Sequence, residues 1–182
     1  GTGVARSVRD RQRVRSASNL DGFVPGEGAA FVLLARRQTA VAARLRPIAA
    51  ISGFTTGVEP GHMYSEQPYR GDGLAAVFAM ALPNGAGAIA DVYSSMNGEH
   101  HWAKEWGVAF MRNRGKFEET HGMHHPADCH GDTGAAAGAI MVGPAALGMN
   151  EGYRRSPCLV YGSSDRGERA AVKLAGKVAI VT

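Results

Sequence analysis

The stretch Cys129–Ile140, CHGDTGAAAGAI, decides the fold of this chain. Gly131, Asp132 and Thr133 lead directly into a run of small residues, which lets a helix pack its backbone closely against a neighbouring element or a ligand. Asp132 or Thr133 is a suitable N-cap, at a helix end whose unpaired N–H groups stabilise anions and reacting oxygens. An ordinary capped helix packed on a sheet explains the same pattern.

A second informative stretch is Asp21–Arg37, DGFVPGEGAAFVLLARR. Asp21-Gly22 is a turn signal, and the short apolar run Ala29–Leu34 predicts a buried strand.

Both stretches resemble motifs of the β-ketoacyl-[acyl-carrier-protein] synthases, condensing enzymes of the thiolase superfamily. The first aligns without gaps with GHTLGAAGAIE, and the second matches DGFVxGEGAGxLVLE. The matching residues are Asp21, Gly22, Phe23, Val24, Gly26, Glu27, Gly28, Ala29, Gly131, Thr133, Ala136, Ala137, Gly138, Ala139 and Ile140. The resemblance covers about residues 20–174 and implies an α/β fold, the C-terminal half of a thiolase-like fold with a mixed sheet flanked by helices.

The order of the remaining predicted elements agrees with βαβ units followed by an antiparallel pair. Helical periodicity, apolar runs and Gly or Pro breaks predict the boundaries. Strands are expected at Ile48–Phe54, Ala88–Ser94, Cys158–Gly162 and Arg169–Leu174, helices at Gln38–Arg46, residues 73–82, Trp102–Arg112 and from Thr133 to Leu147, and a polar connection at Lys116–His130.

Composition and resemblance divide the chain into three parts. Residues 1–20 are a basic segment, 21–174 the thiolase-like half domain, and 175–182 a tail that resembles the first strand of a short-chain dehydrogenase. The tail lacks the glycine-rich turn of a dinucleotide site. The arginines of the basic segment, Arg6, Arg9, Arg11, Arg13 and Arg15, favour a solvated segment over a nucleic-acid arm, since no aromatic residue lies between them.

The bulk composition indicates one globular domain. The chain has 182 residues, 45% of them hydrophobic and 20% charged, with a net charge of +4. Its two cysteines, Cys129 and Cys158, make no disulfide framework, and no apolar run is long enough to span a membrane. We therefore expect a cytoplasmic protein, with neither a membrane nor a nucleic acid as partner, and no cofactor.

The resemblance also identifies candidate site residues. The two catalytic histidines of the family fall on Asn97 and Asp132, and Glu105 replaces a family Asp. Asn97 keeps a hydrogen-bond donor for a carbonyl or oxyanion, whereas an ionised Asp132 repels a developing enolate. Backbone N–H groups near Ser163–Gly167 are further candidate donors. Additional residues expected at the pocket are Glu99, His100, His130, Gly131 and Thr133.

The function implied by the resemblance is acyl transfer of the fatty acid or polyketide condensing type. The family's nucleophilic Cys belongs to the N-terminal half, so this chain alone is expected to be inactive. The implied partners are an acyl carrier protein or acyl thioester, together with an N-terminal half or a second copy that covers an exposed sheet face.

Three alternatives remain open. The chain is a non-catalytic relative that binds a carrier protein or acts as a scaffold, or a repurposed acid–base site built from Asn97, Glu99, His100 and Asp132. A metal-binding protein is the third, with zinc-type ligands at His121, His124, His125, Cys129 and His130, although their spacing matches no closed structural motif.

Overall fold

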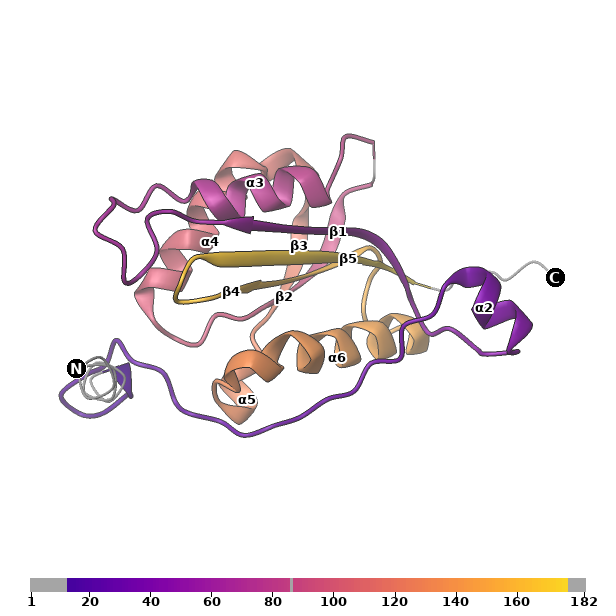
Figure 1. Cartoon of the computed structure of the whole chain (residues 1–182), viewed down its shortest axis with the longest axis horizontal. Coiled ribbons are helices and arrows are strands. Elements are labelled where there is room, and N and C mark those ends of the chain that lie inside the picture. Colours follow the sequence, from indigo (N-terminus) through magenta and orange to yellow (C-terminus); the bar gives the residue numbers. More distant parts are fainter. Residues whose placement is uncertain (1–12, 86, 177–182) are drawn as a thin grey trace.

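A computed structural model describes residues 13–85 and 87–176 of the chain. Five strands form one mixed sheet in the order β1-β5-β4-β2-β3 (Figure 1). The strands are β1 (Ala50–Val58), β2 (Ile89–Ser94), β3 (Phe117–His124), β4 (Cys158–Ser163) and β5 (Glu168–Ala175). The helices are α2 (Arg37–Ala42), α3 (Asp72–Ala81), α4 (His100–Arg112), α5 (Ala127–His130) and α6 (Ala137–Glu151), with 3₁₀ turns η1 (Arg114–Lys116) and η2 (Gly134–Ala136).

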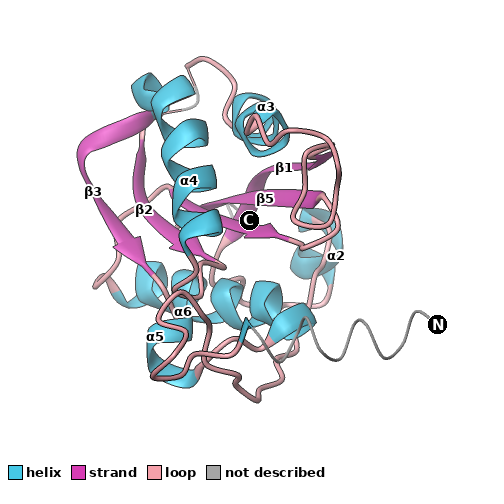
Figure 2. Cartoon of the chain, turned by 90° about the vertical axis from the view of Figure 1, so that its left-hand side faces the viewer, coloured by secondary structure: helices cyan, strands magenta, loops and turns pink. Residues whose placement is uncertain are grey.

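β2 lies inside the sheet, parallel to β4 on one side and to β3 on the other, whereas β5 pairs antiparallel with both β4 and β1. All six residues of β2 are buried, as expected for a strand covered on both faces. α3 and α4 cover one face of the sheet and α6 the other (Figures 1 and 2). The carboxyl ends of β2, β3 and β4 therefore meet at one edge, where ligands bind in open α/β sheets.

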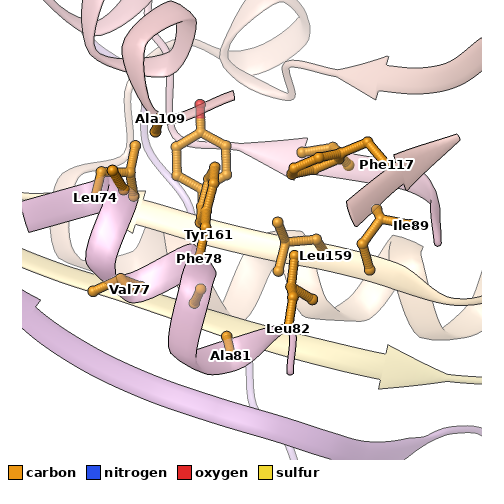
Figure 3. Close-up of a cluster of buried hydrophobic side chains, with 13 residues drawn as sticks. Leu74, Val77, Phe78, Ala81, Leu82, Ile89, Ala109, Phe117, Leu159 and Tyr161 are labelled. Atoms are coloured by element: carbon orange, nitrogen blue, oxygen red, sulfur yellow. The ribbon is translucent and has the colours of Figure 1, made fainter. Parts of the chain in front are cut away.

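The core between the sheet and the α3–α4 layer follows from helical periodicity. Leu74, Val77, Phe78 and Ala81 recur at the spacing that places them on one face of α3, and all four are buried. They pack on strand residues such as Tyr161, whose ring meets that of Phe78 edge to face at 5.2 Å (Figure 3). Each large side chain buried in this way stabilises the fold by about 1.5–3 kcal/mol.

A second core lies on the α6 side of the sheet. Met141, Ala145 and Met149 of α6 pack against Tyr93, Cys158 and other strand residues. These contacts fix α6 against β2, β4 and β5.

The expected α/β fold is confirmed. Seven predicted helices and strands appear within a few residues of their expected bounds, namely β1, α3, β2, α4, α6, β4 and β5. Cys158 is buried, as its place at the start of a strand predicts.

The prediction of a buried strand over Ala29–Leu34 is wrong for this chain. The segment forms no strand, and Phe31, Leu33 and Leu34 are 100%, 82% and 69% exposed. A strand needs a neighbouring edge for its N–H and C=O groups, and no strand of the described residues runs beside this segment.

The prediction of an irregular connection over Lys116–His130 is also wrong, because β3 occupies its first half. β3 pairs in parallel with β2, with Asp91 opposite Gly122 and Tyr93 opposite His124. As an edge strand it buries only Phe117, so it lacks the apolar run that marks a central strand.

Two sequence predictions fall wholly or largely outside the described ranges: the structural state of Arg6, Arg9 and Arg11, and the tail over residues 175–182, of which only 175 and 176 are described. Within the described ranges, none of the helices has the length and apolar character needed to cross a membrane.

Candidate functional site

An open cleft of about 1300 Å³ lies at the carboxyl edge of the sheet. Four segments form much of its wall: the N-terminal segment with Arg13, the loop after β2 with Asn97, the segment before α6 with Asp132, and the end of β4 with Ser163. The cleft thus lies where the topology predicts a ligand site.

Asn97 and Asp132, which are 35 residues apart, meet at this cleft. The Asn97 Nδ2 group donates to Asp132 Oδ2 at 2.7 Å and to Glu99 Oε2 at 3.0 Å. The Asn97 Oδ1 atom accepts from the Glu99 backbone N–H at 3.2 Å. Both amide protons of Asn97 are therefore directed at carboxylates, and Asp132 Oδ1 accepts from the Gly134 N–H at 2.8 Å.

The DGFVPGEG motif positions Asp132 through backbone contacts. The Asp132 N–H donates to Val24 O at 2.7 Å, and the Gly26 N–H donates to Asp132 O at 2.9 Å. A Cβ on Gly26 would lie 2.0 Å from His130 O, and one on Gly131 would lie 2.7 Å from Pro25 O. Only glycine at both positions allows the two segments to approach so closely. Both motifs therefore contribute to holding Asp132 in place.

Arg13 joins three walls of the cleft. Its guanidinium contacts Glu99 through two N–H groups at 2.6 and 2.7 Å, Asp165 at 2.5 and 3.2 Å, and the Tyr64 hydroxyl at 3.1 Å. The Arg13 side chain is 17% exposed, and the hydrogen bond to Glu99 is the largest cause that raises the pKa of Arg13 above its ordinary value. The interpretation of this arginine as part of a solvated segment is therefore wrong: Arg13 is paired with two carboxylates.

A fully buried ion pair lies beside the cleft. Arg169 Nε donates to Glu105 Oε1 at 2.7 Å, and the Ser163 hydroxyl donates to Glu105 Oε2 at 2.5 Å. The two charged side chains are 0% and 1% exposed. Glu105, the residue that replaces a family Asp, thus anchors α4 to the β4–β5 hairpin.

The remaining predicted pocket residues divide into two groups. His130, Gly131 and Thr133 line a small cavity of about 10 Å³ next to the cleft, together with Asp132. His100 instead points away from the cleft: its side chain is 86% exposed, and its Nδ1 atom lies 2.7 Å from Asp21 Oδ1. The structure therefore gives the repurposed acid–base site no imidazole.

The backbone donors expected near Ser163–Gly167 have internal partners. The N–H of Ser163 donates to the Ser95 hydroxyl, and those of Ser164 and Gly167 donate to Glu168 O and Ser164 O. The N–H of Arg166 donates to the Ser164 hydroxyl. These four groups are already satisfied inside the chain and do not form a ready oxyanion hole.

The histidine-rich segment does not converge on one point. In the described parts of the chain, no three His, Cys, Asp or Glu side chains gather in a way that would hold a metal ion. His124 Nε2 lies 2.9 Å from Asp91, His125 Nδ1 lies 2.8 Å from the Ser94 hydroxyl, and His121 Nδ1 lies 3.0 Å from Glu118 O. Each histidine is used in local packing, so the geometry lends no support to the metal-binding alternative.

No family model matches the sequence, and no curated protein matches it either. Solved structures do match the fold. The ketosynthase from module 6 of the bacillaene synthase of Bacillus subtilis 168 superposes with a TM-score of 0.76 at 18% identity, over 97% of this chain and 41% of that chain. The ishigamide ketosynthase/chain length factor gives a TM-score of 0.75 at 18% identity, over 97% of this chain and 51% of that one.

A third similar structure is a type II polyketide synthase acyl carrier protein in complex with its ketosynthase bound to the hexaketide. It gives a TM-score of 0.75 at 16% identity, over 93% of this chain and 48% of the matched chain. The chain has the fold of a ketosynthase half domain. It spans between 41% and 51% of the length of these three ketosynthase-fold chains, and the suspected resemblance is confirmed at the level of the fold.

The sequence alone did not identify three residues that line the cleft. Arg13 belongs to a basic run with no motif, Asp165 lies in the turn that matches the family only loosely, and Arg169 reads as an ordinary strand residue. The one available signal was Glu105, which lies three residues after Trp102 and four before Ala109, on the apolar face of the predicted helix. A carboxylate buried there requires a cation from elsewhere in the fold.

Proposed function

We propose that this protein is an acyl-thioester-binding member of the ketosynthase fold that does not itself catalyse condensation. The hydrogen bonding of Asn97 is the main support. Both of its amide protons are directed at the carboxylates of Glu99 and Asp132, at 3.0 and 2.7 Å. An acyl carbonyl arriving at this point finds no preorganised donor on Asn97 and a carboxylate on Asp132.

Condensation develops negative charge on the thioester oxygen, which requires preorganised donors or cations at that oxygen. The mouth of the cleft instead presents negative charge, from the carboxylates of Glu99 and Asp132. Arg13, a cation that lines the cleft, already donates to Glu99, Asp165 and the Tyr64 hydroxyl. The cleft therefore favours holding an acyl group over activating one.

The proposal includes a partner that bears the acyl thioester, by analogy with the carrier protein that is bound to its ketosynthase in one of the similar structures. It also includes a second ketosynthase-type half that covers the exposed segment 29–34. Phe31 and Leu33 project fully or largely into solvent there, and Phe54 and Val58 of β1 are 63% and 64% exposed. Exposed apolar area of this kind marks a protein interface.

The test combines binding and turnover measurements on the purified protein. Octanoyl-pantetheine is expected to bind, whereas decarboxylation of malonyl-pantetheine and acyl transfer stay at the background rate. Turnover above background would overturn the non-condensing assignment, and failure of octanoyl-pantetheine to bind would overturn the acyl-binding assignment.

A matched pair of variants shows whether binding occurs in this cleft. Gly138 lines the cleft and Gly143 does not, both belong to α6, and a Cβ at either would meet no atom within 4 Å. Gly138→Leu is expected to weaken octanoyl-pantetheine binding at least about tenfold by filling the cleft, whereas Gly143→Leu leaves it unchanged. Equal effects of the two substitutions would place the ligand elsewhere.

A further inference from the structure

We infer that the cleft selects acyl groups without charge, and that Asp132 is the residue that rejects acyl groups carrying a carboxylate. This inference rests on the proposed acyl-binding function and adds the chemical class of the ligand. Asp132 acts here as a specificity-determining residue at the mouth of the cleft.

The charge of Asp132 is not neutralised by a cation. Its two oxygens accept from the Asn97 amide and from the Gly134 N–H, at 2.7 and 2.8 Å. Both donors are neutral, and in residues 13–85 and 87–176 no Lys, Arg or His forms a salt bridge with this carboxylate. Neutral donors orient a carboxylate without cancelling its net charge, so the carboxylate still repels a second anion.

The guanidinium groups of Arg13 and Arg169, which line the cleft, are already paired with carboxylates, and Arg13 has two such partners, so that group keeps a net negative charge. Arg13 lies between Glu99 and Asp165, with its closest contacts at 2.6 and 2.5 Å. Arg169 is paired with Glu105 at 2.7 Å and is completely buried. Neither guanidinium is available to attract an anionic ligand.

The rim of the cleft carries one more opposed pair, Arg166 and Glu168, both exposed on or beside the β4–β5 turn. Arg166 lies close enough to contribute to lowering the pKa of Glu168, although the hydrogen bond from Ser164 contributes most. Solvent and salt screen such exposed charges strongly, so Arg166 does not compensate for Asp132 inside the cleft.

One part of the cleft lining suits an aliphatic chain. It is built from small or apolar side chains, which leave room for a ligand and offer no charge to it: Gly134, Ala135, Ala137, Gly138, Met141 and Ala170. A chain of methylene groups placed there gains about 0.8 kcal/mol per buried CH₂.

Two ligands of nearly equal size test the inference, because propionyl-pantetheine and malonyl-pantetheine differ in one carboxylate. The wild-type protein is expected to bind the propionyl compound on the order of tenfold more tightly, as for two like charges a few ångströms apart in a partly solvated site. Raising the salt concentration to about 0.5 M should reduce this ratio, since Asp132 is reached by solvent.

The Asp132→Asn variant should lower the ratio by about threefold or more, while the propionyl compound binds as before. Asn keeps an acceptor for the Gly134 N–H, and Asp132→Ser provides a second neutral variant if the amide disturbs Asn97. Glu151→Gln, which removes an exposed carboxylate at the end of α6 that does not line the cleft, is the matched control and should leave the ratio unchanged.

Equal binding of the two compounds by the wild-type protein would overturn the inference about Asp132 while leaving acyl binding intact. An unchanged ratio in both neutral variants would do the same. If neither compound nor octanoyl-pantetheine binds at all, the inference fails together with the proposed function.

Discussion

Two polar networks beside the same cleft differ in burial, and we therefore expect them to differ in how much they contribute to stability. The core network, Glu105, Arg169 and Ser163, holds charged groups that are at most 1% exposed. The mouth network, Arg13, Glu99, Asn97 and Asp132, uses similar groups, but Arg13 is 17% exposed and Asp132 faces the cleft.

Because an unpaired charge in the buried core network cannot be solvated, removal of one partner alone should strongly destabilise the fold. The mouth network is partly solvated, so a change in charge there should cost less stability than one in the core network. Four substitutions or conditions sharpen this comparison.

The largest loss of stability is expected from Arg169→Ala. It leaves the buried Glu105 carboxylate without its cation and should lower the free energy of unfolding by about 3–5 kcal/mol, measured by urea denaturation. The double variant Glu105→Leu/Arg169→Met should recover most of this loss, because no charge then remains buried. A loss below about 1 kcal/mol for the single variant would mean that the core network is not the stabilising one.

Gly26→Ala should have the next largest effect, because the new Cβ would lie 2.0 Å from His130 O. We expect a destabilisation of about 1–3 kcal/mol and a displaced Asp132, seen as a changed ratio of propionyl-pantetheine to malonyl-pantetheine binding. The control is Gly143→Ala within α6, where a Cβ meets nothing within 4 Å and should add about 0.5–1 kcal/mol of stability. If Gly26→Ala kept wild-type stability and binding, the close contact between the two motifs would not be needed to position Asp132.

Arg13→Ala tests the mouth network directly. Solvent compensates part of the lost pairing with Glu99 and Asp165, so the expected loss in the free energy of unfolding is about 1–2 kcal/mol. Arg15→Ala, an exposed neighbour, should change stability by less than about 0.5 kcal/mol. Added salt should shrink the Arg13 effect more than the Arg169 effect, and the reverse order would contradict the assignment of the two networks.

The smallest effect concerns His101, which packs on Tyr69 with ring centroids 5.2 Å apart. Burial lowers the pKa of His101 below its ordinary value of 6.5, so the folded state binds a proton less readily than the unfolded state. Stability should therefore fall as the pH decreases below about 6.5, by less than about 1 kcal/mol since the ring is only partly buried. In His101→Gln this loss of stability at low pH should be smaller, which urea denaturation at several pH values would measure. If the variant and the wild-type protein lost the same stability, the loss would come from other titratable groups.

Much of the fold could be predicted because apolar runs and helical spacing report burial directly. β2 and α3 are examples, since both carry the residues that the core requires. β3 could not be predicted, because the stability of an edge strand comes from backbone pairing with β2, which leaves little trace in its polar sequence. Ala29–Leu34 has the composition of a strand, but composition does not provide the neighbouring edge that a strand needs.

For the site, the resemblance brought Asn97 and Asp132 to one place, and the structure agrees that their side chains meet. Their catalytic role remains a prediction. The contacts of Arg13 were not predictable, because they join residues 86 and 152 positions apart and no local pattern encodes such a contact.

The position of Arg13 has a practical consequence for choosing fragments of this protein. Composition places a domain boundary at residue 20, and a truncation that starts at Asp21 would keep every strand of the sheet. It would also cut away the guanidinium that separates Glu99 from Asp165, and two carboxylates would face each other across the entrance. Shortened versions should therefore begin upstream of Arg13, or carry neutral residues at both acidic positions.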